Sequence, residues 1–391
     1  MAVINRVAEF QEDLAAWRRH LHQNPELGFE EHQTSAFVAE KLKEFGVDEI
    51  HAGIAGTGVV GVIRAGSGTR SIGIRADMDA LPIAERSGKA WASKVPGKMH
   101  ACGHDGHTTL LLGAARYLAE TRNFDGTVYF YFQPAEEGLG GARKMVEEGL
   151  FERFPADQVF GLHNWPSLPV GSFAMCEGPA MAAADKFVIG LTGVGCHAAM
   201  PHLGRDPIIA ASLIVQALQS IVSRQIDPLD NAVVSVTRIS GGDTFNVVPE
   251  RVEMIGTVRT YKPETQAFIR QRMQEVAEGI AAAQGLEASF EWRAGYPATV
   301  NASREAALGA DIAAEIVGED KVDRAPLPVM GAEDFSYMLL QRPGAYIWMG
   351  NGGGDDGKVL HSPYYDFNDE ALPYGVSYFS RLAERLLPRA A

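Results

Sequence analysis

Strand-like and helix-like segments alternate along most of this chain of 391 residues, and this alternation limits its fold more than any other feature. Alternating strands and helices favour a largely parallel α/β sheet with helices on both faces. Ligands of such sheets bind beyond the carboxyl ends of the strands. The predicted strands of this pattern span residues 58–63, 71–76, 128–132, 159–162 and 345–349. The predicted helices span residues 5–21, 34–45, 108–118, 142–148, 305–317 and 374–387.

A different order of elements begins near Asp185. It runs strand, helix, strand, strand, helix, strand, which is the ferredoxin-like βαββαβ unit. Asp206 and Pro207 are favoured residue types for the start of its first helix. Because 391 residues are about twice the size of a usual domain, we expect a smaller domain inserted into a larger one. The predicted boundaries are residues 1–184 and 296–391 for the larger domain and residues 185–295 for the smaller one.

The composition excludes several classes of partner. The formal net charge of −14 argues against nucleic-acid binding, because neutralising phosphates needs a basic face. No apolar run approaches the ~20 residues of a membrane span, so we expect no membrane partner. Three cysteines, Cys102, Cys176 and Cys196, are too few for a disulfide framework. We therefore predict a cytoplasmic protein.

A glycine-broken loop before the predicted helix 108–118 carries two metal-ligand residue types. Cys102 and His104 flank Gly103, which lets the backbone bend so that a thiolate and an imidazole face one ion. The alternative is a polar helix-start loop with a buried thiol. His100 and His107, in the same stretch, are expected to support the ligands or to lie on the surface.

Two adjacent acids, Glu136 and Glu137, follow the apolar strand 128–132 after Pro134. Paired glutamates usually begin a solvated helix, but three glycines follow within four residues and indicate tight packing. One carboxylate can bind a metal while its neighbour stays available as a general base. The pattern alone does not decide which residue does which.

Two more histidines lie near strand ends. His163 closes the strand 159–162, and His361 follows a glycine-rich loop, residues 351–357, that can bring it over the site. Each alone is typical of a structural or surface histidine. Because the carboxyl ends of parallel strands share one edge of a sheet, we expect all these ligand types to meet there.

Three further residues have a functional and an ordinary interpretation. Asp77 either orients a ligand imidazole or is a turn acid. Glu333 either supports the site or favours a helix N-terminus by its charge. His197, in a glycine-hinged turn of the smaller domain, either donates to an oxyanion or has no catalytic task.

The motifs MHACGHD (99–105) and QPAEEG (133–138), with LHQNPEL (21–27), resemble one family along nearly the whole chain. This is the amidohydrolase branch of the aminoacylase and glutamate-carboxypeptidase metallopeptidase family. The branch includes hippurate hydrolase, auxin-conjugate amidohydrolase and N-acetyldiaminopimelate deacetylase. The resemblance implies a zinc-peptidase-like catalytic domain with an inserted ferredoxin-like lid, homo-oligomers formed through that lid, and hydrolysis of N-acyl amino acids.

The resemblance also assigns roles residue by residue. Cys102 would bridge two divalent ions, either Mn²⁺ or Zn²⁺, with Ni²⁺ or Co²⁺ as further candidates. Glu136 would be the general base and His197 would stabilise the oxyanion. Asn246 and Arg259 match positions that contact the substrate carboxylate. The other metal ligands would be His104, Glu137, His163 and His361.

Two positions depart from the family pattern. Cys196 stands where this branch usually has glycine, which could stiffen the turn that presents His197. Arg75 stands where the carboxypeptidase relatives have a histidine ligand, so this chain would rely on Cys102 and His104 instead.

Two other functions remain open at this point. A cysteine hydrolase would use Cys102 as nucleophile with His104 or His107 as base, but it would leave Glu136 and Glu137 idle. A catalytically inactive binding protein on the same fold would have no need of the spare acid Glu136.

Overall fold

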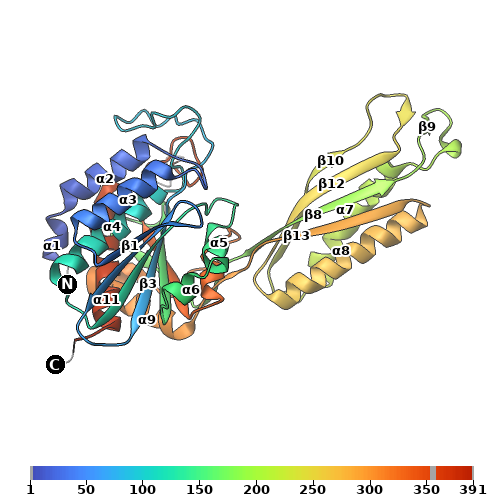
Figure 1. Ribbon diagram of the computed structural model, residues 1–391. Coiled ribbons are helices and arrows are strands. Elements are labelled where there is room, and N and C mark those ends of the chain that lie inside the picture. Colours follow the sequence, from blue (N-terminus) through green and yellow to red (C-terminus); the bar gives the residue numbers. More distant parts are fainter. Residues whose placement is uncertain (1–2, 353–357, 390–391) are drawn as a thin grey trace. The chain divides into compact units, whose positions relative to one another are not determined.

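The computed structural model describes residues 3–352 and 358–389, and the described chain forms two compact units. The larger comprises Met1–Ala180, Thr299–Leu327 and Asp334–Ala391, and the smaller comprises Met181–Ala298 and Pro328–Glu333. Figure 1 shows the chain leaving the first unit, building the second and returning. Of the glycine-rich loop 351–357, which was expected to bring His361 over the site, residues 353–357 lie outside the described residues.

The larger unit is built on one mixed sheet. Its four central strands, in the order β4-β3-β5-β16, are mutually parallel. Strands β1 and β2 extend one side in antiparallel fashion, and β6 and β15 complete the other. The bounds are β1 Glu49–Ile54, β2 Gly58–Ala65, β3 Ser71–Asp77, β4 Gly126–Gln133, β5 Gln158–Trp165, β6 Phe173–Ala174, β15 Val322–Asp323 and β16 Gly344–Gly350. A small two-stranded sheet pairs β7 Gly178–Met181 with β14 Thr299–Asn301.

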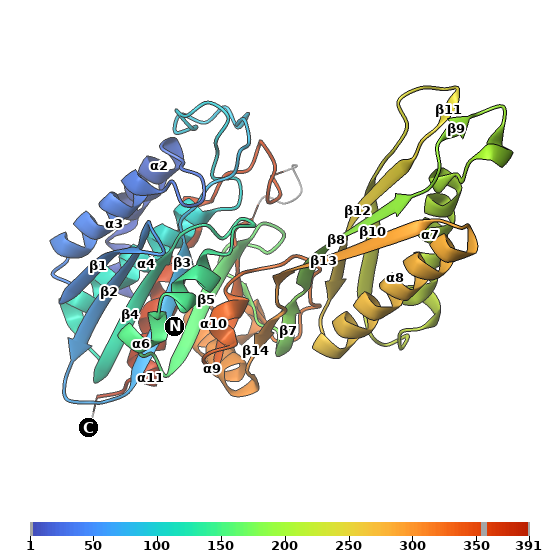
Figure 2. The ribbon, with the colours of Figure 1, turned by 45° about the vertical axis from the view of Figure 1, so that its right-hand side comes forward.

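Helices cover both faces of this sheet. On one face α4 packs against α2, α3 and α11, and α9 packs against α11, around one apolar core. Helices α5, α6 and α10 lie over the other face (Figure 2). The bounds are α1 Asn5–Ala8, α2 Gln11–Gln23, α3 His32–Glu44, α4 His104–Thr121, α5 Gly141–Glu147, α6 Leu150–Arg153, α9 Ser303–Val317, α10 Ser336–Leu339 and α11 Leu372–Leu386.

The predicted fold class is confirmed, with three corrections. The expected helix 5–21 is broken into α1 and α2. Strand β1 was not predicted, although Ile50, Ala52 and Ile54 alternate with the period of a strand. Helix α4 begins at His104, four residues earlier than predicted, so that histidine lies in the first turn rather than in the loop.

The smaller unit has the predicted βαββαβ order of elements. Its sheet runs β10-β12-β8-β13, with every neighbouring pair antiparallel. Helices α7 and α8 pack on each other and on one core with the sheet. The bounds are β8 Ala183–Thr192, α7 Pro207–Arg224, β10 Ala232–Ser240, β12 Arg251–Thr260, α8 Pro263–Ala283 and β13 Glu287–Tyr296. A short pair, β9 Cys196–His197 and β11 Val247–Val248, completes it.

Buried charges anchor the first turn of α4. Asp105 accepts a hydrogen bond from the Nδ1 of His22 in α2, at 2.8 Å, and both side chains are fully buried. The Arg18 guanidinium, also buried, lies 3.9 Å from the same carboxylate. Burial alone would lower the pKa of His22, but the carboxylates of Asp105 and then Glu85 together outweigh burial and raise the pKa to about 9. Because Asp105 adjoins His104, this ion pair fixes the helix turn that carries His104.

This pair predicts a pH-dependent stability. The free energy that charged His22 contributes is fully present below its unfolded pKa of about 6.5 and is lost as the pH rises through about 9. We expect the difference in unfolding free energy between the wild type and His22→Gln to shrink across that interval. Urea denaturation of the metal-free proteins measures it, and a constant difference contradicts the ion pair.

Candidate metal centre

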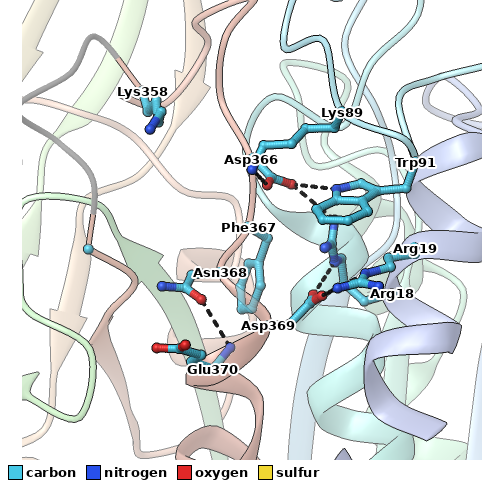
Figure 3. A pocket seen from close by; sticks show the side chains of 11 residues that line it. Arg18, Arg19, Lys89, Trp91, Lys358, Asp366, Phe367, Asn368, Asp369 and Glu370 are labelled. Atoms are coloured by element: carbon cyan, nitrogen blue, oxygen red, sulfur yellow. Dashed lines mark hydrogen bonds and ion pairs between the residues drawn. The ribbon is translucent and has the colours of Figure 1, made fainter. Parts of the chain in front are cut away.

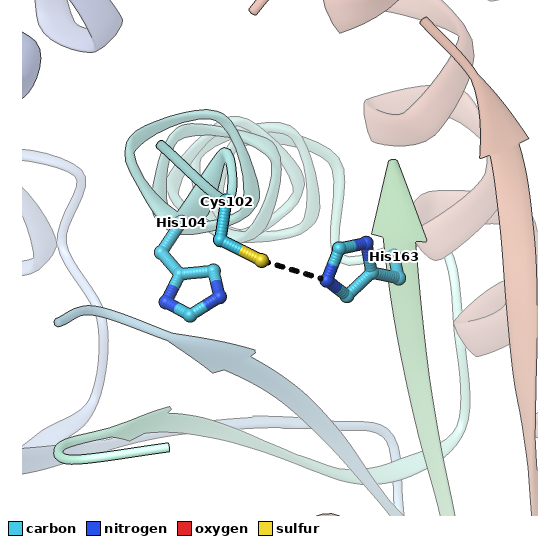
Figure 4. A group of neighbouring side chains, drawn as sticks. All are labelled: Cys102, His104 and His163. Atoms are coloured by element: carbon cyan, nitrogen blue, oxygen red, sulfur yellow. Dashed lines mark hydrogen bonds between the residues drawn. The ribbon is translucent and has the colours of Figure 1, made fainter. Parts of the chain in front are cut away.

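Three buried ligand atoms converge where the loop before α4 meets β5. The Cys102 Sγ lies 3.4 Å from the His163 Nε2, and His104 completes a group whose ligand atoms are all within 4.8 Å of one another. Figure 4 shows the thiol pointing at the His163 ring with the His104 ring beside it. Such separations suit ligands that each lie about 2.0–2.3 Å from one ion.

The hydrogen bonds of the two histidines fix which ring nitrogen faces the centre. The His104 Nδ1 lies 2.9 Å from the Asp79 carbonyl oxygen, and the His163 Nδ1 lies 2.7 Å from the Asn164 carbonyl oxygen. A carbonyl only accepts, so each Nδ1 carries a hydrogen. In the neutral rings both Nε2 atoms therefore present lone pairs, as ligand histidines held by outer hydrogen bonds do.

A second group of ligand atoms shares the same thiol. Cys102, Glu137 and His361 also place one ligand atom each within 4.8 Å of one another, and the His361 Nε2 lies 3.2 Å from the Glu137 Oε1. His361 has φ +64°, a left-handed conformation that costs a non-glycine residue roughly 1–3 kcal/mol. The two groups overlap in Cys102, the geometry of a ligand between two ions.

The two adjacent acids have different surroundings. The Glu137 backbone N–H donates to the Asp79 Oδ2 at 2.9 Å, and its carboxylate belongs to the group of Cys102 and His361. Glu136 is buried and belongs to a group with His104 and Glu137. The two acids thus share His104 as a neighbour, and Glu137 also belongs to the group of Cys102 and His361.

Unsatisfied polar atoms support metal binding. The His104 Nε2 and the Glu137 Oε1 are buried without a hydrogen-bond partner among residues 3–352 and 358–389. The Glu137 Oε1 is close to the His361 Nε2, but the two atoms do not have the geometry of a hydrogen bond. A buried polar atom without a partner is costly, and an imidazole nitrogen and a carboxylate oxygen are both atom types that bind divalent metals. The donor set therefore fits divalent ions.

Without metal, several of these ligands hold protons. Burial lowers the pKa of His104, but the Asp77 carboxylate outweighs it and raises the pKa well above its usual value. The neighbouring Cys102 and Glu137 side chains raise the pKa of His361 to about 10. Burial raises the pKa of the Cys102 thiol and lowers that of His163. At neutral pH a metal must therefore displace protons from this centre.

Asp79, which the sequence did not single out, holds the imidazole of His104. Asp77 accepts a hydrogen bond from the His107 Nδ1 at 2.6 Å, and its other oxygen lies 3.6 Å from the His104 Nε2. His107 and His100 are buried. Asp79 lies two residues after Asp77, the last residue of β3. Its position just beyond the carboxyl end of a strand was the feature of the sequence that could have identified it.

Arg75, which stands where the carboxypeptidase relatives have a histidine ligand, is used in buried ion pairs instead. It is buried in β3, where it pairs with Asp77 at 2.7 Å and with Asp334 at 3.0 Å, and it donates to the Gln133 side chain. Glu333, beside Asp334 in sequence, is also buried, and its supporting role remains a prediction.

The predicted residues of the smaller domain lie at two ends of its sheet. His197 and Asn246 adjoin each other, because β9 pairs with β11 and the Ala198 N–H donates to the Asn246 carbonyl at 3.0 Å. Arg259 pairs with Ala184 at the other end of β8. His197 and Asn246 are exposed, and Arg259 is half-buried. Cys196 pairs with Val248 in this turn.

A separate pocket of about 370 Å³ lies beside α2 (Figure 3). Several of its charged residues are already paired: the Arg18 Nε donates to Asp369 at 2.6 Å, and Lys89 lies 2.9 Å from Asp366. The Trp91 Nε1 also donates to Asp366, at 3.0 Å. Of the described residues that line it, none is a predicted site residue.

Comparisons with known proteins agree with this geometry. Residues 73–385 match the sequence profile of Peptidase family M20/M25/M40. The chain is 42% identical over 387 residues to a hippurate hydrolase of Campylobacter jejuni, covering 99% of this chain and 100% of that one. It is also 42% identical to an N-acetylcysteine deacetylase of Bacillus subtilis, covering 96% and 97% of the two chains.

A solved structure is similar over the whole chain. A Bacillus subtilis protein described as a dinuclear metal-binding peptidase of this family superimposes with a TM-score of 0.85 at 38% identity. The similarity covers 97% of this chain and 99% of that chain.

The protonated ligands predict how metal uptake depends on pH. Because His361 with a pKa of about 10 and the Cys102 thiol must lose protons, binding of Zn²⁺ should release protons and strengthen as the pH rises. Calorimetry in buffers of different ionisation enthalpy counts the released protons. His361→Gln should release fewer, and an unchanged count would contradict the assignment of His361.

Proposed function

This chain belongs to peptidase family M20/M25/M40, and from that premise we propose that it hydrolyses the amide bond of N-acyl amino acids. It is a metal-dependent amidohydrolase of that family. The observation that carries the proposal is the pair of ligand groups that overlap in Cys102. One ion would be held by Cys102, His104 and His163, and the other by Cys102, Glu137 and His361.

The metal ions would supply Lewis acidity, lowering the pKa of water and polarising the amide carbonyl. We propose Mn²⁺ or Zn²⁺ as the native ion, with Ni²⁺ and Co²⁺ as further candidates. Imidazole and thiolate ligands accommodate all of these, so availability in the cell would select among them.

Glu136 would move the proton. Its carboxylate is buried and shares a group with His104 and Glu137, and its Oε1 lies 3.4 Å from the Asp334 backbone N–H. As general base it would accept a proton from the attacking water and then deliver it to the leaving nitrogen. Glu137 is the proposed ligand beside Cys102 and His361, so Glu136 is the acid that we propose as the base.

Two observations disfavour a cysteine nucleophile that uses His107 as its base, whereas the form that uses His104 is decided by the chelation test below. A catalytic thiol needs a lowered pKa, whereas burial raises the pKa of Cys102. His107 is not available as its base, because the Nδ1 is bonded to Asp77 and the Nε2 accepts from Asn164. An inactive binding protein would leave the buried carboxylate of Glu136 without a use.

The substrate class follows from the relatives and from one cation. The similar proteins are named for hippurate, which is N-benzoylglycine, for N-acetylcysteine and for auxin–amino acid conjugates, and all of these are N-acyl amino acids. Arg259 would bind the substrate carboxylate as a forked partner. This local positive charge would attract the substrate carboxylate, which the formal net charge of −14 would otherwise repel.

His197 and Asn246 would act on a different copy of the site from Arg259. The strand register sets Ala184 against Arg259 and Thr192 against Arg251, so the two ends of β8 are separated by roughly 25 Å at ~3.3 Å per residue. His197 follows the Thr192 end. One N-acyl amino acid is much shorter than this separation. We therefore propose that His197 serves the site of a second subunit and stabilises the oxyanion there.

The smaller unit offers an apolar face for that second subunit. Ile208 and Ile209 of α7 are 46% and 53% exposed, and Leu213, one turn on, is 39% exposed. By length and composition α7 could also cross a membrane, but its other side is buried in the core of the βαββαβ unit. We propose that the protein forms a homo-oligomer through this exposed face of α7. Within the described residues all three cysteines are free thiols, which fits a cytoplasmic enzyme.

Replacing the general base tests the function. Glu136→Gln should lower kcat for N-benzoylglycine by about 10²–10⁴-fold. Its affinity for Zn²⁺ should remain, because Glu137 holds the ion. Chelation should abolish wild-type activity, and added Mn²⁺ or Zn²⁺ should restore it. Full turnover by the variant would end this mechanism, and activity that resists chelation would favour the thiol alternative.

Mixed oligomers test whether two subunits build one site. Arg259→Ala and His197→Ala homo-oligomers should each be nearly inactive. Co-expressed, they form mixed pairs in which one site has both residues intact, so activity should return. No return would place both residues in the same subunit's site. Leu213→Glu, which weakens the proposed interface, is the control and should prevent the recovery.

A further inference from the structure

One buried amide touches each of the segments that carry Cys102, His163 and His361. Asn164 is fully buried at the end of β5. Its Nδ2 donates to the Cys102 carbonyl oxygen at 2.6 Å, and its Oδ1 accepts from the Tyr365 hydroxyl at 2.7 Å. Its own carbonyl accepts from the His163 Nδ1.

Tyr365 belongs to the segment that carries His361. The two are four residues apart, and the His361 backbone N–H donates to the Ala101 carbonyl at 2.8 Å. The loop of Cys102 and the segment of His361 are thus joined twice, once directly and once through Asn164. Each junction fixes backbone, and backbone position decides where the ligand side chains begin.

His107 fixes the orientation of the amide. Because its Nδ1–H donates to the Asp77 carboxylate, its Nε2 can only accept, and it does so from the Asn164 backbone N–H at 2.9 Å with the Nδ2 at 3.0 Å. The Cys102 carbonyl also only accepts. Both neighbours therefore require the NH₂ of the amide on their side and the oxygen toward Tyr365.

Gly103 allows the loop to approach this amide. A Cβ at that position would lie 2.3 Å from the Asn164 Nδ2 and 2.4 Å from the Tyr365 hydroxyl oxygen, and φ is +90°. Glycine in the loop thus serves the closure onto Asn164 as well as the bend between two ligands.

We propose that Asn164 is a positioning residue for the metal pair, because it clamps the three ligand-bearing segments at the separation that shared coordination by Cys102 needs. The inference rests on the proposed function and extends it to a residue that holds no metal itself. The clamp is made of fully satisfied buried hydrogen bonds, which rigidify a site more than exposed ones do.

Metal affinity tests the clamp. Asn164→Ala and the milder Tyr365→Phe should each bind Zn²⁺ about 10–100-fold more weakly, as loss of an outer hydrogen bond to a ligand typically does. Competition with a chromophoric chelator measures the affinity without any turnover. Saturating Zn²⁺ should restore much of the activity, because Glu136 is untouched.

The same unit supplies matched controls. Asn301 is also buried and donates to the carbonyls of Cys176 and Tyr346, and the buried Tyr131 hydroxyl donates to the Phe154 carbonyl at 2.8 Å. Asn301→Ala and Tyr131→Phe should lower thermal stability comparably but leave the affinity for Zn²⁺ unchanged.

Each outcome decides between the hypotheses. Wild-type affinity in Asn164→Ala, or an equal loss in Asn301→Ala, would overturn the clamp. If Asn164→Ala does not fold, Tyr365→Phe against Tyr131→Phe decides the question. A wild-type protein that binds no metal would instead overturn the proposed function, so the two failures are distinguishable.

Discussion

The shared thiol of Cys102 is the constraint on which the rest of the site depends. A thiol that belongs to both ligand groups must be approached from two directions by side chains from distant segments. Its neighbour Gly103 has a left-handed φ, and α4 begins immediately afterwards, so the ligands Cys102 and His104 straddle a sharp change of backbone direction. The parallel sheet supplies the other approach, because His163 lies near the carboxyl end of β5 and His361 follows the adjacent strand β16 in sequence.

Buried charge keeps this arrangement in place. On the side of α2 the pair of His22 and Asp105 holds the first turn of α4, and beneath the ligands Arg75 joins Asp77 to Asp334. Buried ionic groups are stable only when they are fully paired, so removing one partner costs more than a surface pair ever contributes. The centre is therefore surrounded by contacts that tolerate little substitution, while the ligand atoms themselves keep unsatisfied capacity for metal.

Single residue types point to the candidate site. Thiol, imidazole and paired carboxylates are recognisable as ligand types. Cys102, His104, Glu137, His163 and His361 were named from sequence and belong to the groups of converging ligand atoms, and their role as metal ligands stays a prediction. Their supporting contacts were not, because Asp79, Asn164 and Tyr365 are ordinary polar residues whose importance comes from what folding places beside them. His107 illustrates the difference. In the sequence it is one more histidine in a histidine-rich stretch, and only the structure shows that both its ring nitrogens are occupied by hydrogen bonds with Asp77 and Asn164.

Sequence by itself determined the α/β class, the βαββαβ order of the inserted segment and the family resemblance, because periodicity and motifs are local properties of the chain. Tertiary structure alone decided that β1 and β2 extend the parallel strands in antiparallel fashion, and it brought the atoms of two ligand groups together at the Cys102 thiol, which the family resemblance had only implied. It also separated Arg259 from His197 by the length of a strand. These facts depend on register and on contacts between residues far apart in the chain, and no local pattern of side chains encodes them.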